Sequence, residues 1–379
     1  MSCLEKQKTV AIIINTSWNI YNFRLGLLCA LQRKGYRVVA IAPVDRYSAK
    51  LSAYDIEHHA ITMNNKGTNP FEDIKLFFSY VKILRHLSPD VILSYTIKPN
   101  IYATWAAGVL KIPVIANISG LGTVFLNDSF SSKVARFLYR VALKIPHKVF
   151  FQNREDKEIF LHKSLVNQKQ AEVIAGSGID TKKFSPLEGV QKSSKGVRFL
   201  FVGRVLKDKG ILEYIEAAKR LKGYLGCHFY ILGACDVQNP TAIKREELRV
   251  WEDEGVVTYL GVSDDVDSVM QQYDCVVLPS YREGLSRVLL EAASMQKPII
   301  TTNIAGCKEV VDDGENGYLC CVKDVESLVL QIQRMIHLTQ EEREAMGKKG
   351  RQKVEEHFSE SRVIDAYVKT LEEIFSQEA

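Results

Sequence analysis

The sequence lacks the features that mark several other classes of protein. No apolar run approaches the roughly 20 residues needed to span a bilayer, and the apolar residues 10–14 are too few for the core of a signal peptide. We therefore interpret that run as a first strand and expect the protein to stay in the cytoplasm. None of the eight cysteines forms a Cys-x-x-Cys pair, so reduced, buried thiols are expected rather than disulfides or a zinc site.

Signatures of cofactor, metal and nucleic-acid binding are also missing. No Gly-x-Gly-x-x-Gly follows either opening strand, which argues against a dinucleotide oxidoreductase. There is no zinc-finger spacing and no aromatic-basic strand of the RNA-binding type, so nucleic acid is not expected as a partner. Acid pairs such as Asp265 and Asp267 are interpreted as helix caps or solvated acids. We expect neither a bound cofactor nor a metal.

The length and the pattern of apolar runs predict two domains of the α/β class. A chain of 379 residues exceeds the size at which a single core usually keeps growing. Short, almost wholly apolar runs alternate with helical patterns, as expected for parallel strands buried on both faces of a sheet. These runs predict strands at residues 10–15, 37–43, 91–96, 114–119, 148–153, 172–176, 197–203, 228–233, 256–260, 275–279, 298–302 and 317–322. Two such series indicate two doubly wound, Rossmann-like domains.

A polar stretch at residues 185–196 separates the two series. It is rich in turn-forming residues and has no periodicity, so we predict a linker there. The first domain is then expected at residues 1–184 and the second at 197–358, followed by a strong helical pattern at about 359–379. Open α/β sheets bind ligands beyond the carboxyl ends of their strands, and two such domains facing each other would form a cleft.

The two halves carry charge of opposite sign. Residues 1–185 contain 25 Lys and Arg against 13 Asp and Glu, whereas the remainder contains 25 against 32. By charge alone, a basic half fits nucleic acid, an anionic membrane surface or a phosphorylated lipid, and the missing motifs argue against the first of these. Within it, residues 132–144 have a helical pattern whose cations share one face while apolar residues fall largely on others: Lys133, Arg136, Arg140 and Lys144. This is either a headgroup-binding helix or a core helix with a solvated basic stripe, and the charge of the whole half favours the membrane.

The segment 278–291 carries the most informative pattern. A buried strand ends at Pro279, a turn carries Glu283 and Gly284, and a helix is expected to begin near Leu285. Amides at a helix start bind phosphate oxygens, and glycine lets the backbone approach closely. Glu291 follows Glu283 by eight residues, on the order of 12 Å along a helix, comparable to the span from a sugar ring across a diphosphate to a ribose. The alternative is a surface helix with two solvated glutamates.

A second pattern follows the first strand of the second half. Gly203 turns the chain at the end of that strand, and Arg204 and Lys209 stand beside it. Breaking a sugar–phosphate bond leaves negative charge on the departing diphosphate, which fixed cations stabilise as it develops. Lysines and arginines often decorate surface turns, but a position at the same predicted sheet edge as Glu283 favours a phosphate site.

Taken in order, these motifs resemble the retaining glycosyltransferases called family 4. The resemblance covers the whole second half through Gly203-Arg204, Lys209-Gly210, Glu283-x7-Glu291 and Gly306-x2-Glu309-x4-Gly314-x2-Gly317. In the first half, residues 98–102 and 119–125 are similar to bacterial members that extend polyprenyl-diphosphate-linked oligosaccharides. Such members serve capsule, O-antigen, exopolysaccharide or glycoprotein glycan assembly.

The resemblance implies a GT-B fold, in which two Rossmann-like domains face each other across a cleft and the final helix crosses back to the first domain. It implies metal-independent, retaining transfer of a hexose or N-acetylhexosamine from a UDP-sugar to a polyprenyl-diphosphate-linked glycan. By resemblance, Arg204 and Lys209 would hold the diphosphate and Glu283 the donor sugar, and these three are the candidate catalytic residues. The candidate donor-binding residues are Gly203, Gly261, Val262, Gly284, Leu285 and Glu291.

Two features of many family members are absent from the first half. Asn15-Thr16 stands where they carry a Gly-Gly turn, and Lys98 stands near the place of a histidine, where it would serve acceptor phosphate. The candidate acceptor-binding residues are Asn15, Thr16, Arg24, Lys98, Gly120 and Gly122. The two departures leave a second hypothesis, a catalytically silent sugar-nucleotide-binding subunit of a glycan-assembly complex. For an active enzyme, the expected partners are the nucleotide sugar, a polyprenyl-diphosphate-linked sugar and the anionic inner face of the cell membrane.

Overall fold

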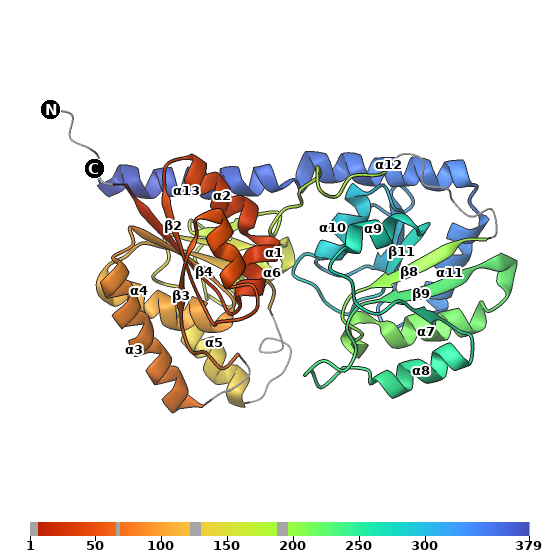
Figure 1. Ribbon diagram of the computed structural model, residues 1–379, viewed down its shortest axis with the longest axis horizontal. Coiled ribbons are helices and arrows are strands. Elements are labelled where there is room, and N and C mark those ends of the chain that lie inside the picture. Colours follow the sequence, from red (N-terminus) through yellow and green to blue (C-terminus); the bar gives the residue numbers. More distant parts are fainter. Residues whose placement is uncertain (1–6, 66–68, 122–129, 188–195, 379) are drawn as a thin grey trace. The chain divides into compact units, whose positions relative to one another are not determined.

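The computed structural model describes residues 7–65, 69–121, 130–187 and 196–378. It comprises two compact units, the first formed by Met1–Ser177 with Glu360–Ala379 and the second by Gly178–Ser359 (Figure 1). The division thus falls before the predicted linker at 185–196. Ile179 and Phe184 are buried in the core of the second unit, and Ser294 Oγ donates to Phe184 O at 2.5 Å. Residues 178–184 therefore belong to the second unit, because their apolar side chains find their core there.

The first unit is built on a seven-stranded parallel sheet with the order β3-β2-β1-β4-β5-β6-β7. The strand order reverses between β1 and β4, which makes this pair the switch point where open α/β sheets bind ligands. The strands are β1 (Thr9–Ile13), β2 (Arg37–Ala42), β3 (Glu57–Ala60), β4 (Val91–Tyr95), β5 (Val114–Ile118), β6 (Lys148–Phe151) and β7 (Ala171–Val173). The helical elements are α1 (Ser17–Phe23), α2 (Leu25–Arg33), η1 (Ala49–Tyr54), α3 (Pro70–Leu87), the π-turn η2 (Pro99–Ala103), α4 (Thr104–Leu110), α5 (Phe130–Ala142) and α6 (Arg154–His162).

Each face of the first sheet has its own apolar core. Along β1, Ala11 belongs to one cluster and Val10 to the other, because successive strand side chains point to opposite faces. The final helix, α13 (Glu360–Glu378), covers the second cluster and belongs to the first unit (Figure 1). Its buried residues recur at helical spacing, as expected for one face of an amphipathic helix: Val363, Tyr367, Leu371 and Ile374.

The second unit is built on a six-stranded parallel sheet with the order β10-β9-β8-β11-β12-β13. Its switch point lies between β8 and β11. The strands are β8 (Arg198–Val202), β9 (His228–Leu232), β10 (Thr258–Tyr259), β11 (Cys275–Leu278), β12 (Ile299–Thr302) and β13 (Gly317–Cys320). The helical elements are η4 (Lys207–Lys209), α7 (Ile211–Arg220), η5 (Tyr224–Gly226), α8 (Arg245–Asp253), α9 (Val266–Gln271), α10 (Arg287–Ser294), α11 (Val325–His337) and α12 (Gln340–His357).

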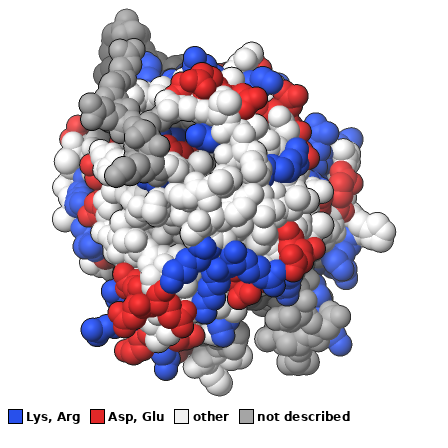
Figure 2. Space-filling model, turned by 90° about the vertical axis from the view of Figure 1, so that its right-hand side faces the viewer, with Lys and Arg blue, Asp and Glu red and all other residues white. Residues whose placement is uncertain are grey.

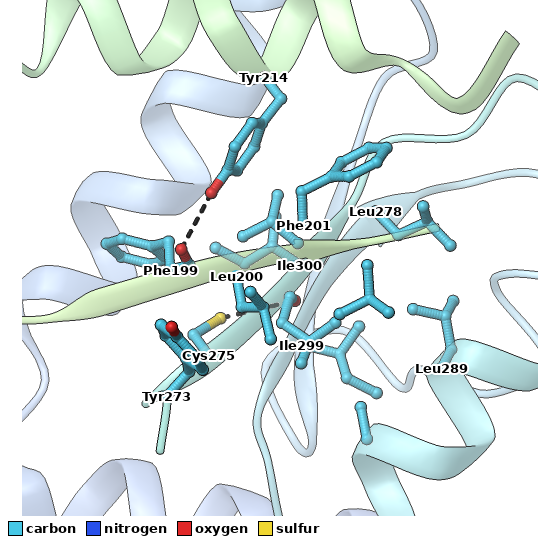
Figure 3. Packing of buried hydrophobic residues seen from close by; sticks show 14 of the residues in the cluster. Phe199, Leu200, Phe201, Tyr214, Tyr273, Cys275, Leu278, Leu289, Ile299 and Ile300 are labelled. Atoms are coloured by element: carbon cyan, nitrogen blue, oxygen red, sulfur yellow. Dashed lines mark hydrogen bonds between the residues drawn. The ribbon is translucent and has the colours of Figure 1, made fainter. Parts of the chain in front are cut away.

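The central strand β8 fills the second core from both of its faces (Figure 3). Phe199 and Phe201 lie on the side of Tyr214 of α7, whose hydroxyl donates to Phe199 O at 3.0 Å. Leu200 lies on the opposite side of the sheet, towards Leu289 of α10. All five side chains are buried, and each contributes about 1.5–3 kcal/mol of stability. This packing holds the sheet between α7 and α10 and so fixes the strand ends from which the site is built.

Charged side chains on the face drawn in Figure 2 form adjoining groups of both signs around a neutral area. The part of this face that the structure describes therefore has no single sign of charge. A surface of one sign is what attracts a polyanion over long range.

Candidate active site

Three neighbouring strands of the second sheet end in glycine at the same edge. Gly203 directly follows β8, Gly233 directly follows β9 and Gly261 lies two residues after β10, with φ values of 147°, 144° and 78°. A Cβ on Gly233 would lie 1.9 Å from Gly203 O, so these strand ends meet backbone to backbone. A Cβ on Gly203 or Gly261 would instead meet nothing within 4 Å. The edge therefore exposes bare backbone that a phosphate or a flat ring can approach closely.

The turn η4 is held against the end of β11. It ends at Gly210, where φ is +73° and where a Cβ would lie 2.0 Å from Pro279 O. Only glycine permits this close approach of turn and strand. A backbone hydrogen bond also joins the two segments, because Tyr281 N, after β11, donates to Asp208 O of η4 at 2.9 Å.

This contact brings Lys209 and Glu283 together. Lys209 Nζ forms a short ion pair with Glu283 Oε1, and Ser280 Oγ donates to the same oxygen at 2.8 Å. The two charged side chains are 21% and 13% exposed. Within the part of the chain that is described, Glu283 Oε2 makes no hydrogen bond. A cation and an acid thus lie together at the glycine edge, with one carboxylate oxygen able to accept a hydroxyl.

The loop that carries Glu283 is supported by Gly306. A Cβ on Gly306, where φ is +80°, would lie 2.5 Å from Glu283 O. Ser286 N donates to Gly306 O at 2.8 Å, and Gly306 N donates to Glu309 Oε2 at 2.6 Å. The Gly306-x2-Glu309 part of the motif is therefore a scaffold for Glu283.

The helix start differs from the prediction. α10 begins at Arg287 with Ser286 as its N-cap, so the expected start near Leu285 is wrong. Gly306 accepts the Ser286 amide and holds Ser286 at φ −73° and ψ 106°, outside the helical region. Residues 283–286 therefore do not continue the helix, and the 12 Å rise predicted between Glu283 and Glu291 does not describe their separation. Gly284 and Leu285 precede the helix, and the first helical amides belong to Arg287 and Val288.

Glu291 lies on α10 and is paired within that helix. Arg287 Nε lies 3.0 Å from Glu291 Oε1, one helical turn away, and Arg287 Nη1 donates to Gly178 O at 3.3 Å. Burial raises the pKa of Glu291, and Arg287 offsets part of that rise. A carboxylate whose ionised form is disfavoured by burial gains from any ligand that donates hydrogen bonds to it.

The remaining donor-side candidates are more open. Arg204 is exposed and makes no hydrogen bond or ion pair to any described residue, so the structure brings Lys209 but not Arg204 against Glu283. Val262 follows Gly261 and is 67% exposed.

In the first unit, Asn15 and Thr16 follow β1, and Arg24 lies beside the end of β4. Thr16 caps α1 by accepting from Asn19 N at 3.2 Å, and the buried Asn15 Oδ1 has no hydrogen-bond partner among the described residues. Arg24 is 4% exposed, and its guanidinium lies 4.5 Å from the centre of the Tyr95 ring. Its Nη1 donates to the Gly176 carbonyl at 3.4 Å, while its buried Nε has no hydrogen-bond partner in the part of the chain that the structure describes. A buried cation without a paired acid is a costly arrangement that an anionic ligand would relieve.

Lys98 is paired with an acid that the sequence analysis did not single out. Its Nζ lies 2.6 Å from Asp73 Oδ1, and Tyr102 donates to Asp73 Oδ2 at 2.8 Å. Both charged residues line a groove of about 710 Å³ between residues 60–64 and α3. Two residues before Lys98 in the chain, Thr96 has a φ of +66°. Strained backbone conformations of this kind are concentrated at functional sites. Gly120 has a φ of +130°, and Gly122 lies outside the described residues.

Comparisons with known proteins identify the family. The models "Glycosyl transferases group 1" and "Glycosyl transferase 4-like" match residues 187–353 and 9–153. The chain is 30% identical over 342 residues to the N,N'-diacetylbacillosaminyl-diphospho-undecaprenol alpha-1,3-N-acetylgalactosaminyltransferase of Campylobacter jejuni, which covers 86% of this chain and 89% of that protein. It belongs to the group 1, family 4-like glycosyltransferases.

A second relative supports the family assignment, and a solved structure shows the fold. The chain is 26% identical over 343 residues to the capsular polysaccharide biosynthesis glycosyltransferase CapM of Staphylococcus aureus, covering 87% of this chain and 88% of CapM. Its fold is similar to that of Anabaena HepE in complex with UDP and glucose, with a TM-score of 0.76 at 17% identity, covering 96% and 99% of the two chains. The predicted GT-B class, with two Rossmann-like domains, is confirmed, and the protein is a hexosyltransferase.

The described residues lack two features, a membrane-spanning helix and a cluster of metal ligands. Within the described residues, no helix is both long and apolar enough to cross a membrane. In the same residues, no three His, Cys, Asp or Glu side chains come together as metal ligands would. Asp265 takes the N-cap position of α9 but makes no side-chain capping hydrogen bond there.

Sequence reasoning missed two polar residues of the glycosyltransferase. Ser280 donates to Glu283, and Asp73 neutralises Lys98. Neither belongs to a recognisable spacing, since each meets its partner only through the fold. The one signal for Ser280 was its position directly after the apolar run that ends at Pro279.

Proposed function

We propose that this hexosyltransferase moves a hexose or N-acetylhexosamine, with retention of configuration, from a UDP-sugar to a polyprenyl-diphosphate-linked glycan. The Lys209–Glu283 pair at the glycine edge of the second sheet carries the proposal. The Campylobacter jejuni relative, named for an undecaprenyl-linked acceptor, supports the acceptor class, and CapM supports a role in polysaccharide assembly. HepE, seen with UDP and glucose, supports the donor class.

On the donor side, Lys209 and Arg204 hold the diphosphate while Glu283 Oε2 accepts a hydrogen bond from a hydroxyl of the donor sugar. Lys209 is paired with Glu283, so a diphosphate competes with that carboxylate for the ammonium group. The backbone at Gly203 and the first amides of α10 face phosphate oxygens. Gly261 and Val262 border the base, and Glu291 accepts from the ribose.

The transfer step needs no side-chain base. The acceptor hydroxyl oxygen attacks the anomeric carbon on the face from which the diphosphate departs. The bond between that carbon and the phosphate oxygen breaks, and the hydroxyl proton passes to the departing phosphate oxygen. Lys209 and Arg204 stabilise the negative charge that develops on the diphosphate, which is the largest demand of this step.

On the acceptor side, the basic first unit receives the lipid-linked diphosphate at the anionic inner face of the cell membrane, where the protein is peripheral. Arg24 supplies a buried cation near the end of β4, and Lys98 supplies one in the groove beside α3. Asn15 and Thr16 offer polar side chains after β1, and Gly120 offers its backbone after β5.

The test is transfer from a UDP-sugar to a polyprenyl-diphosphate-linked saccharide. We expect Lys209→Ala, Arg204→Ala and Glu283→Ala each to lower the transfer rate by roughly 100-fold or more, because each removes a group that acts on developing charge or on the donor sugar. Lys207→Ala is the matched control, since Lys207 is an exposed lysine on the same turn. It should retain full activity. Wild-type transfer by any of the three variants, at unchanged unfolding midpoint, would remove that residue from the mechanism.

A further inference from the structure

Helix α3 is apolar on two opposite faces. It begins where Asn69 accepts from Phe71 N at 3.0 Å and Pro70 takes the first helical position. Its inner face buries Leu76, Tyr80 and Leu84 in the first unit. The opposite face exposes a row of apolar side chains that we call the α3 stripe: Phe71 (81% exposed), Ile74 (55%) and Phe78 (63%).

The spacing of the α3 stripe shows that it is one continuous surface. Its members are three and four residues apart, so they lie one above the other on the helix. Single exposed apolar residues are ordinary, but a row of two phenylalanines and an isoleucine facing solvent indicates a surface that something covers.

Cations flank the α3 stripe. At about 100° per residue, Lys75, Lys82 and Arg85 fall within about 60° of Phe78 around the helix axis, and all three are exposed. Apolar side chains bordered by lysine and arginine are the pattern of helices that lie in the plane of a membrane surface.

Helix α5 also has exposed apolar residues among its cations. The sequence pattern had predicted that the apolar residues fall largely on other faces than the cations, and this prediction is wrong for part of the helix. Its core contacts come from Tyr139, Ala142 and the adjoining Leu143, all buried. A second stripe faces solvent among the basic residues instead of packing inside, and we call it the α5 stripe: Val134 (40% exposed), Phe137 (62%) and Val141 (40%). Both α3 and α5 contact η2, and both begin towards the lower end of the first unit in Figure 1.

We propose that the α3 stripe and the α5 stripe insert together into a phospholipid bilayer that contains anionic lipids. This inference rests on the proposed function, which requires a membrane-borne acceptor, and it adds the element and the mode of attachment. Insertion of the apolar rows supplies a salt-resistant part of the binding, and the flanking cations supply a salt-sensitive part. A second copy of the chain is a poorer occupant, because a two-fold contact between these faces would bring like charges together.

The experiment is sedimentation of the full-length protein with vesicles of phosphatidylglycerol and phosphatidylcholine, at low salt and at about 0.5 M salt, where the Debye length is about 4 Å. Wild type should remain bound at both. Phe71→Ser/Phe78→Ser should lose roughly tenfold or more of its partitioning at high salt, because the apolar part of the binding is gone. Lys133→Gln/Lys144→Gln should weaken binding at low salt and match wild type at high salt. Val250→Ser, at a 52% exposed apolar residue of α8, is the control and should bind like wild type.

Three outcomes would overturn this inference: equal high-salt binding by the double phenylalanine variant, release of wild type at high salt, or a concentration-dependent dimer in light scattering that the same variant abolishes without changing vesicle binding.

A separate readout isolates the proposed function. With a water-soluble, short-chain prenyl-diphosphate-linked acceptor, the double phenylalanine variant should transfer sugar at the wild-type rate. Failure of wild type with that acceptor would count against the proposed function and leave the vesicle result standing.

Discussion

At the residue scale, the site depends on glycines that permit contacts no side chain would allow. Gly210 lies against Pro279 and Gly306 lies against Glu283, each in the left-handed region. These two contacts hold the Lys209 turn and the Glu283 loop at the same end of β11. The candidate catalytic side chains are thus positioned by residues that have no side-chain chemistry of their own.

Replacing Gly306 with alanine should disturb Glu283 specifically. We expect Gly306→Ala to lower the free energy of unfolding by about 1–3 kcal/mol through backbone strain and to reduce transfer severely, because its Cβ would collide with Glu283 O. Gly314→Ala is the matched control, since Gly314 has the same φ of +80° and a Cβ there would meet nothing within 4 Å. Urea unfolding and the transfer rate measure the two effects. Equal activity in both variants would show that the contact with Glu283 does not matter.

Glu291 should make stability depend on pH. Its folded pKa is raised by burial, so the native state holds a proton that the unfolded chain has released, and stability falls as pH rises above about 4.3. Glu291→Gln removes this titration. In urea unfolding without ligand, we expect the stability of the variant relative to wild type to rise from pH 4 to pH 7. A relative loss over the same range would mean that the ion pair with Arg287 outweighs burial.

At the element scale, α13 lies in the first unit, the domain to which the resemblance expects the final helix to return. Its buried stripe completes the second core of the first unit, where the Tyr367 ring lies 4.9 Å from that of Phe150 and its hydroxyl accepts from Asn117 Nδ2 at 3.1 Å. Helix α13 therefore covers one face of the sheet of the first unit and completes the apolar core on that face.

Truncating Tyr367 should destabilise the first unit. We expect Tyr367→Ala to cost about 3–5 kcal/mol of the free energy of unfolding, because it leaves a cavity, and Tyr367→Phe to cost about 1 kcal/mol for the lost hydrogen bond. Lys369→Ala, at an exposed position of the same helix, should be neutral. Hydrogen exchange measured along β4 to β6 reports on this unit. Unchanged exchange in Tyr367→Ala would show that α13 contributes little to that core.

At the scale of the whole molecule, the two units divide the proposed work between a basic half and an acidic half. The candidate donor residues all lie in Gly178–Ser359, and the candidate acceptor residues all precede it. From this division we expect a nucleotide ligand to bind to the second unit and to stabilise it before it affects the first unit.

Binding of UDP should stabilise the second unit. A ligand at a hundred times its Kd adds about 2.7 kcal/mol to the stability of the state that binds it. We expect UDP to raise the unfolding temperature and to protect amides at 203–210 and 283–291 from hydrogen exchange. Lys209→Ala should lose most of this effect, and Lys207→Ala should keep it. Protection confined to other segments would contradict the donor site.

The sequence by itself determined the two parallel sheets, because strands buried on both faces must be almost wholly apolar. All twelve predicted strands are present, and among the described residues the one strand that was missed is β3, an edge strand whose sequence is Glu-His-His-Ala. The glycine-rich motifs and the family were likewise readable, since they depend on local spacing. Tertiary structure alone decided which groups meet. The Lys209–Glu283 and Lys98–Asp73 pairs, the delayed start of α10 and the outward turn of the α5 stripe all result from contacts between segments distant in the chain, which no local pattern encodes.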